Sequence, residues 1–242
     1  MVLYANRGVH GQTVEALARK VLSGEFAQGQ ILDLTALQRE LDVSLTALRE
    51  SLKVLSAKGM VDARQKRGTF IRPRSDWNLL DADVLRWQSS VDSGTGLLAS
   101  LDEVRYIFEP AAAQFAAERR TDDDLRTLEA ALSAMAEGSG SPGGEDQFDL
   151  AFHRALLVAA HNELLARMEV IVESAMAERS KFESRSARCA DHVLSHRAVL
   201  EAVRRRDPAA AAAAMCHVLD HAKSAAGRGG DPSPADSIPN TA

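Results

Sequence analysis

A carboxylate and an imidazole at helical spacing form the strongest metal-binding pattern in this sequence. Asp149 and His153 lie four residues apart in a segment, 146–160, that has the periodicity of a helix. Residues at i and i+4 share one helix face, so both can bind one ion, and His196 on a later helix could add a third ligand. Three such ligands with an open position suit a divalent cation such as zinc. The alternatives are that these side chains contact a small acid directly, or are surface and hydrogen-bonded core residues.

Arg105 offers a different chemistry, because it interrupts the apolar face of the helix expected at 97–119. A guanidinium group presents two N–H donors to one carboxylate, which makes Arg105 a candidate clamp for an acidic small molecule. The alternative is a buried ion pair with Glu109, which lies four residues further along the same helix.

Polar side chains near the start of the helix expected at 44–58 could contact nucleic acid. They lie opposite an inward stripe of leucines, and a recognition helix needs exposed polar groups at this end. Arg49 suits a base contact, because one guanidinium can bind O6 and N7 of guanine together, although a salt bridge within the helix is the alternative. The hydroxyl groups suit phosphate contacts. The candidates on this helix are Ser44, Thr46, Arg49 and Lys53.

A basic turn follows this helix, between strands expected at 60–64 and 69–72. Its glycine allows a close approach of the backbone to a groove or a phosphate, and its cations can bind phosphates themselves. The alternative is a solvated turn. The three further candidate DNA contacts in this turn are Lys66, Arg67 and Gly68.

The elements that position these residues are mostly helices. Helices expected at 13–23, 34–41 and 44–58, followed by the two strands, have the order of a winged helix-turn-helix. Apolar periodicity then predicts a bundle of six or seven helices. The helices expected after the winged part are 81–90, 97–119, 121–137, 146–160, 163–183, 190–206 and 208–225.

The expected fold is therefore mostly α, with an N-terminal winged helix-turn-helix and a C-terminal all-α helical bundle. We expect the winged unit at 1–74, a linker with a short helix at 75–96, the bundle at 97–226 and a disordered tail at 227–242. The glycine-rich loop at 138–144 is expected to be flexible.

Charge is distributed unevenly between these parts. The chain has 242 residues and a formal net charge of −5, which by itself argues against a nucleic-acid partner. Residues 1–74, however, hold 12 Lys and Arg against 7 Asp and Glu, whereas the remainder holds 17 against 27. A basic domain joined to an acidic one suggests a polyanionic partner for the first domain only. The alternative is chance asymmetry of surface charge.

Composition argues against several other classes of protein. No stretch approaches the roughly 20 apolar residues that a membrane span needs, and the N-terminal segment lacks the core of a signal peptide. Two cysteines, Cys189 and Cys216, cannot form a disulfide framework. We therefore expect a cytoplasmic protein without membrane association.

Short motifs in the N-terminal part resemble the GntR family of bacterial transcription regulators. They run from Val43 to Val61 around the expected recognition helix, and from Arg67 to Ile71 in the wing. The resemblance implies a winged helix-turn-helix that binds double-stranded operator DNA as a homodimer. One departure is Leu45, which stands where the family usually carries arginine, so the operator of a relative does not transfer to this chain.

The C-terminal part resembles the FCD ligand-binding domain of the FadR subfamily. Asp149, Phe152 and His153 match its D-x-x-F-H motif, and residues 196–202 match its later H-R-x-I-L-x-A motif. The resemblance implies a helical domain that binds a small effector. The positions that it assigns to effector binding are Arg105 and Glu109.

The resemblance also implies four metal ligands, the fourth being a histidine three residues after a methionine on the last helix. Counting from Met215, that position is Val218. His217 lies one residue earlier, about 100° round a helix, and His221 lies three residues later. The expected ligands of a divalent metal ion are therefore Asp149, His153, His196 and His217, with His221 as the alternative fourth.

The function that the resemblance implies is a regulator, most simply a repressor, that releases DNA when its bundle binds a small carboxylate. Residues 77–87 in the expected linker are similar to the galactonate-regulator branch, which favours a sugar acid as effector. Two other classes stay open. Three metal ligands with an open position could activate water in a metal-dependent enzyme, although a hydrolytic motif such as H-E-x-x-H is missing. The bundle alone could also serve as a protein-interaction module.

Overall fold

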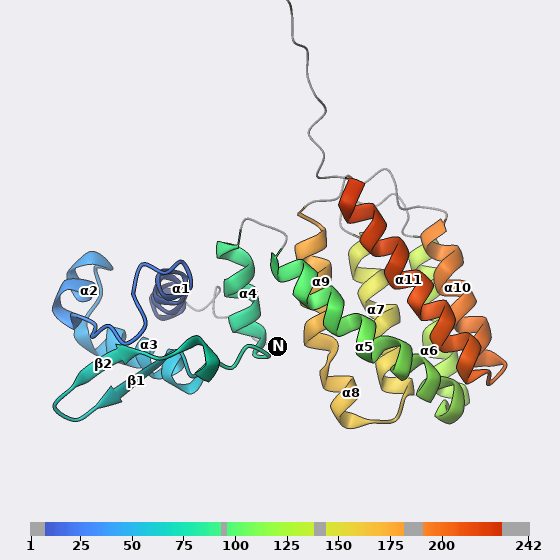
Figure 1. The fold of residues 1–242 in the computed structure, drawn as a ribbon, viewed down its shortest axis with the longest axis horizontal. Coiled ribbons are helices and arrows are strands. Elements are labelled where there is room, and N and C mark those ends of the chain that lie inside the picture. Colours follow the sequence, from blue (N-terminus) through green and yellow to red (C-terminus); the bar gives the residue numbers. More distant parts are fainter. Residues whose placement is uncertain (1–7, 93–95, 138–143, 182–190, 229–242) are drawn as a thin grey trace, which may run out of the picture. The chain divides into compact units, whose positions relative to one another are not determined.

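The chain forms two compact units, Met1–Leu97 and Leu98–Ala242, each described by itself below (Figure 1). The first contains a small two-stranded sheet and the second is built of helices. The computed structural model describes residues 8–92, 96–137, 144–181 and 191–228.

Three expected features fall largely outside these ranges. Most of the tail expected at 227–242 and of the loop expected at 138–144 lies outside the described residues, as does Cys189. The last described helix reaches Arg228, so the first two residues of the expected tail are helical.

The first unit has the element order of a winged helix-turn-helix, as the sequence predicts. Asp33 and Ser44 cap its second and third helices: Asp33 Oδ1 accepts backbone N–H groups at 2.9 and 3.0 Å, and Ser44 Oγ accepts the N–H of Ala47 at 3.1 Å. The elements are α1 (Gly8–Leu22), α2 (Leu34–Glu40), α3 (Leu45–Ala57), β1 (Val61–Arg64) and β2 (Gly68–Ile71).

The wing is an antiparallel pair in which Val61 lies opposite Ile71 and Arg64 lies opposite Gly68. The turn between the strands needs left-handed backbone: φ is 65° at Lys66 and 86° at Gly68. Glycine adopts this conformation without steric cost, which explains its place at the end of the basic turn.

A helix in the expected linker packs on the first unit. Within α4 (Ala82–Val91), Val84 and Trp87 are fully buried and belong to the same apolar cluster as Leu17 of α1 and Leu48 of α3. The burial of the large indole ring of Trp87 anchors α4 on the helices of the first unit. The chain from 82 to 91 is therefore part of the first compact unit.

Asp81 joins the end of α3 to the start of α4. Its Oδ1 accepts the N–H groups of Asp83 and Val84 at 3.0 and 3.2 Å, which caps α4, and accepts Lys58 Nζ at 2.6 Å. Lys58 also donates to Asp83 Oδ2 at 2.9 Å. Burial alone would lower the pKa of Lys58, but these two carboxylates raise it. The end of α3 and the start of α4 are thus connected by charge-assisted hydrogen bonds.

The second unit is an all-α bundle, as the sequence predicts (Figure 1). The sequence predicts one helix at 163–183, but the structure has two, because the helix is interrupted at Met168. There ψ is −4°, and the backbone N–H of Met168 donates to the carbonyl of Leu165, three residues earlier, at 2.9 Å. The helices are α5 (Gly96–Arg119), α6 (Asp122–Glu137), α7 (Gly144–Ala159), α8 (Glu163–Arg167), α9 (Glu169–Arg179), α10 (Asp191–Arg204) and α11 (Pro208–Arg228).

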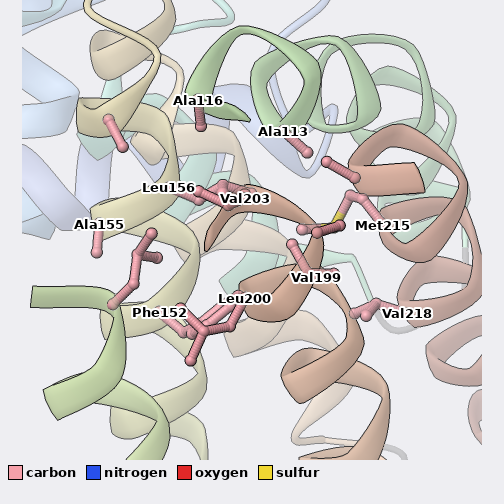
Figure 2. Packing of buried hydrophobic residues seen from close by; sticks show 14 of the residues in the cluster. Ala113, Ala116, Phe152, Ala155, Leu156, Val199, Leu200, Val203, Met215 and Val218 are labelled. Atoms are coloured by element: carbon pink, nitrogen blue, oxygen red, sulfur yellow. The ribbon is translucent and has the colours of Figure 1, made fainter. Parts of the chain in front are cut away.

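The core of the second unit lies between α5, α6, α7, α10 and α11. Figure 2 shows Phe152 and Leu156 of α7 together with Val199 and Leu200 of α10, and Met215 of α11 to their right in the view. Alanines on α5 keep that helix close to its neighbours. This packing fixes the relative positions of α7 and α10, which carry the expected metal ligands.

Candidate metal centre, effector site and nucleic-acid interface

Three ligand atoms from α7 and α10 converge inside the bundle. Asp149 Oδ1 lies 3.0 Å from His196 Nε2 and 3.4 Å from His153 Nε2, and the two Nε2 atoms lie 3.3 Å apart. A cation bound at about 2.0–2.1 Å by three tetrahedrally placed ligands holds them about 3.3–3.4 Å apart. The triangle therefore has the size that a divalent cation requires.

A buried oxygen supports the fit to a cation. Asp149 Oδ1 is buried and has no hydrogen-bond partner of normal geometry among the described residues, although two imidazole nitrogens face it. A carboxylate oxygen and two imidazole nitrogens that converge away from water need a positive charge close to them, which a bound cation or a protonated imidazole supplies. One carboxylate and two imidazoles fit a divalent ion such as zinc.

The far sides of both imidazoles are held by hydrogen bonds. His196 Nδ1 donates to the carbonyl of His192 at 2.8 Å, and His153 Nδ1 bonds Glu109 Oε2. Phe152 packs edge-to-face against His196, with ring centroids 5.0 Å apart. These contacts turn both Nε2 atoms towards Asp149, an arrangement typical of metal-ligating histidines.

Charges inside the bundle shift the pKa values of this group strongly. Burial alone would raise the pKa of Glu109, but Arg105 and His153 outweigh burial and lower it to about 2. Burial would lower the pKa of His153, but Glu109 and Asp149 raise it to about 9. In the absence of a metal ion, His153 is therefore protonated near neutral pH and carries the positive charge of the site.

The other two ligands keep the forms that a metal needs. Burial would raise the pKa of Asp149, but His192, His153 and His196 hold it well below its usual range. Burial lowers the pKa of His196 despite the attraction of Asp149. An ionised carboxylate and a neutral imidazole already face one another here, as metal binding requires.

Arg105 lies beside this group, in the ion pair that the sequence left open as an alternative. Its Nε donates to Glu109 Oε1 at 2.5 Å, and its NH1 lies 4.0 Å from Asp102 Oδ1. Asp102 in turn accepts Arg179 NH2 at 2.6 Å. Positive and negative side chains thus alternate from Arg179 through Glu109 to the candidate metal ligands.

The expectation for the fourth ligand was wrong. His217 is exposed on α11, whereas Val218 is buried at 2% exposure in the apolar core (Figure 2). His221 is exposed as well. The reason is geometric. Neighbouring side chains on a helix point about 100° apart, and on α11 it is Val218 that faces the core, so His217 faces solvent. Among the described residues, the group that could hold a cation is Asp149, His153 and His196.

Sequence reasoning missed three residues of this region. The sequence does not place His192 among the expected ligands, yet its Nε2 lies 3.5 Å from Asp149 Oδ2 and its ring centroid lies 4.4 Å from that of His196. The spacing of four between the two histidines was the signal that could have found it. Asp102 and Arg179 lie 77 residues apart, and only the fold brings them together.

The expected DNA contacts on α3 lie together on its exposed side. Thr46, Arg49 and Lys53 are exposed, opposite the buried leucines. Lys53 Nζ donates to Glu50 at 2.8 Å, an intrahelical pair of the kind proposed as the alternative for Arg49. Ser44 is exposed too, and although its oxygen caps α3, its O–H can still donate to a phosphate.

The wing presents its basic turn to solvent. Lys66, Arg67 and Gly68 are exposed, and the Arg67 guanidinium stacks over the ring of Phe70 at 4.1 Å from the centroid. Stacking restricts the flexible arginine while its N–H groups stay accessible at the edge of the guanidinium plane.

A three-helix unit with an exposed polar helix and a basic wing is the fold of a DNA-binding protein. Residues 10–71 match the gntR family of bacterial regulatory proteins, and residues 101–221 match the FCD domain. The chain belongs to the GntR family of transcription regulators and carries an FCD domain.

Known relatives agree with this assignment. The galactonate operon transcriptional repressor of Escherichia coli (strain K12) is 32% identical over 203 residues, which are 82% of this chain and 88% of the relative. The transcriptional regulator LutR of Bacillus subtilis (strain 168) is 35% identical over 65% of this chain and 71% of its own. The solved structure of Streptococcus agalactiae GntR has a TM-score of 0.51 and 26% identity, and covers 89% of this chain and 100% of its own.

These matches identify a transcription regulator. They do not support the alternative of a metal-dependent enzyme, which the sequence had left open. In the part of the chain that the structure describes, we find no helix with both the length and the apolar character that a bilayer crossing requires.

Proposed function

We propose that this regulator is a repressor that binds operator DNA as a homodimer and releases it when a small acid enters the helical bundle. The observation that carries the proposal is the convergence of Asp149, His153 and His196 beside Arg105, in a chain whose other unit reads DNA. The chemistry is that of an anion receptor: one resident cation and one guanidinium group near each other.

Each residue of the site has a role in this proposal. Asp149, His153 and His196 would hold a divalent cation such as zinc, which supplies a Lewis-acidic centre for oxygen ligands. Glu109 orients two side chains at once, since one of its oxygens bonds Arg105 and the other bonds His153. Arg105 uses Nε for that contact, and its outer N–H groups, one of which lies 4.0 Å from Asp102 Oδ1, would bind the carboxylate of the effector.

A sugar acid fits this arrangement better than a plain fatty acid. A 2-hydroxy carboxylate can place its carboxylate and hydroxyl oxygens on one cation, and its other hydroxyls hydrogen-bond to buried polar groups. The galactonate operon repressor at 32% identity makes D-galactonate the first acid to test. With three protein ligands, a tetrahedral cation would keep one position open for such an oxygen.

The DNA side follows from symmetry. A dimer presents two copies of α3 to the half-sites of a pseudo-palindrome, spaced about 34–36 Å or a multiple apart. The acid releases the operator if it binds the non-reading arrangement of the dimer more tightly than the reading one. The protein acts where the operator is, in the bacterial cytoplasm.

The test measures DNA binding by the full-length, metal-loaded protein. Fluorescence anisotropy on its own upstream intergenic DNA, in low salt, is expected to show tight binding that D-galactonate or a related sugar acid reverses. Prior removal of the metal with a chelator should abolish the response to the acid but keep DNA binding. Absence of DNA binding contradicts the operator assignment, and an acid response that survives the chelator contradicts the role of the cation.

Analytical ultracentrifugation of the same sample tests the dimer. A species of twice the chain mass is expected at micromolar concentration, and a monomer that binds the operator with full affinity would contradict the symmetric arrangement.

A further inference from the structure

Two arginines from different helices meet at one carboxylate near the candidate metal site. Arg179 at the end of α9 donates through NH2 to Asp102 Oδ1 at 2.6 Å, and Arg105 NH1 lies 4.0 Å from the same oxygen. The two arginine side chains are only 2% and 7% exposed. Cations held this far from water need anionic partners, so their surroundings are suited to a carboxylate.

Two carboxylates that contact these arginines, Glu109 and Asp102, differ in how easily they can turn away from them. Glu109 is 1% exposed and bonds His153 as well as Arg105, so its removal would break two buried contacts. Asp102 is 18% exposed and lines an open groove of about 650 Å³ between α5 and α11. The other charged residues that line this groove are Glu103, Asp220 and Lys223. Asp102 can therefore turn its carboxylate into a solvated space, whereas Glu109 cannot.

We propose that Arg179 joins Arg105 in binding the carboxylate group of the effector, and that Asp102 occupies this position in the ligand-free protein. The inference rests on the proposed function, because it names residues that bind the proposed acid. One carboxylate replaces another in the exchange, so the buried charge stays the same and the cost of burying an additional anion is avoided. An arginine pair also recognises the planar carboxylate geometry more specifically than a single cation.

The exchange has a structural consequence within the second unit. Asp102 lies in the second turn of α5, and its bond to Arg179 ties this end of α5 to the end of α9. Binding of the acid replaces this intramolecular tie by a contact with the ligand. The released turn of α5 is the part of the bundle that follows the DNA-binding unit most closely in sequence.

Isothermal titration of the full-length protein, saturated with zinc, tests the proposal. The probes are D-galactonate, D-gluconate and L-lactate, with the uncharged galactitol as the control ligand, and the acid that the wild type binds most tightly is used throughout. Asp102→Asn removes the internal competitor and is expected to tighten acid binding by about threefold or more. Arg179→Gln removes a donor pair and is expected to weaken it about tenfold or more.

Glu103→Gln is the matched control for Asp102→Asn. Glu103 is the next residue on α5, is exposed and lines the same groove, so this change alters the net charge equally without touching either arginine. It is expected to leave the affinity for the acid unchanged. A gain in Asp102→Asn that Glu103→Gln shares would show a general charge effect and would overturn the proposal.

The double variant Asp102→Asn/Arg179→Gln addresses folding, because it leaves neither partner as an isolated buried charge. It is expected to bind the acid as weakly as Arg179→Gln, since the gain from Asp102→Asn needs Arg179. Acid binding at wild-type strength in this double variant, or in Arg179→Gln with a native circular dichroism spectrum, overturns the proposal. If the wild type binds none of the acids, the effector class of the proposed function fails together with this inference. If it binds one and these variants bind it unchanged, only this inference fails.

Discussion

His192 orients two of the three candidate metal ligands although it is not one of them. Its carbonyl accepts His196 Nδ1, and its Nε2 lies 3.5 Å from the second oxygen of Asp149, which leaves Oδ1 to face the site. Outer contacts of this kind set the direction and basicity of a ligand, so a change beyond the first ring of atoms alters metal affinity.

The change His192→Ala is therefore expected to lower zinc affinity about 10–100-fold, because Asp149 loses the contact at Oδ2 while all three ligand atoms remain. Competition with a chromophoric chelator on the full-length protein measures this affinity. His217→Ala is the matched control on α11 and is expected to bind zinc like the wild type, since His217 is exposed and outside the ligand group. Equal affinity in His192→Ala and the wild type would contradict the orienting role.

Arg49 is the residue on which sequence-specific reading is expected to depend. Arg49→Ala should weaken binding to the natural operator by about 1–3 kcal/mol while changing non-specific duplex binding little, because the loss concerns a base contact. Anisotropy titrations on both duplexes measure the difference. Arg154→Ala, which breaks pairs with Glu169 and Glu173 in the bundle, is the control and is expected to leave both titrations unchanged. Equal losses on both duplexes for Arg49→Ala would assign Arg49 to the phosphates instead.

At the residue scale, the sequence predicts those site residues whose separation along the chain places them on one face of a helix. Asp149 and His153 are found from a separation of four, and their convergence with His196 follows once α7 and α10 pack together. His217 was chosen as the fourth ligand by counting residues, and the count could not show which face of α11 packs into the core. Asp102 and Arg179 could not be found at all, since neither belongs to a pattern and their contact depends on tertiary packing.

At the scale of elements, capping residues fix where several helices begin. Thr121 and Asp124 form a reciprocal cap at the start of α6: Asp124 Oδ2 accepts the N–H and the hydroxyl of Thr121 at 2.8 and 2.7 Å, and the hydroxyl oxygen accepts the N–H of Asp124 at 3.2 Å. His161 Nε2 contacts the same carboxylate at 2.8 Å. One side chain thus fixes a helix start and a loop after α7.

This cap gives a stability prediction with a defined pH dependence. Burial would raise the pKa of Asp124, but the Thr121 donors and His161 lower it below 3.8. A carboxyl group whose pKa is lower in the folded state than in the unfolded state stabilises the fold at pH values above its unfolded-state pKa. This contribution is lost as the pH falls from the unfolded-state pKa through the folded-state pKa. Asp124→Asn is therefore expected to cost about 1 kcal/mol at pH 7, and the difference from the wild type should shrink as the pH falls below about 3.8.

Urea unfolding followed by circular dichroism measures this effect. Asp122→Asn in the same helical turn is the control, because its side chain is 85% exposed in its pair with Arg120, so little change is expected. A difference for Asp124→Asn that stays constant into strong acid would contradict the ionised cap.

Two elements were harder to predict than the caps. The break at Met168 has no glycine or proline to announce it, so periodicity alone continues one helix across it. The short helix at 82–91 was recognised as a helix, but its amphipathic pattern could not say which surface would receive Trp87. Both shortfalls concern partners in space rather than local preference.

At the scale of the whole molecule, the uneven charge of the sequence corresponds to two units with different partners. The basic excess belongs to the winged helix-turn-helix, and the acidic excess belongs to the chain that includes the helical bundle. Composition could show this separation because net charge needs no knowledge of the fold. It could not show that several charges of the bundle are buried in one ionic network, which only the packing reveals.

The proposed site also makes a prediction about the whole molecule, because cation and acid share it. Linkage requires that a factor by which zinc raises the affinity for the acid equals the factor by which the acid raises the affinity for zinc. Titrations of zinc with and without saturating D-galactonate, and of D-galactonate with and without zinc, are expected to give one factor well above unity. A factor of one in both would place the acid outside the coordination shell.

The contact between Asp81 and Lys58 couples α4 to α3. Because one carboxylate both caps α4 and accepts Lys58 at the end of α3, we expect these two helices to move together. A tilt of α4 would then change the direction in which Arg49 points, without any unfolding of the winged unit. A small rotation of this kind would be enough to weaken the contact of α3 with an operator.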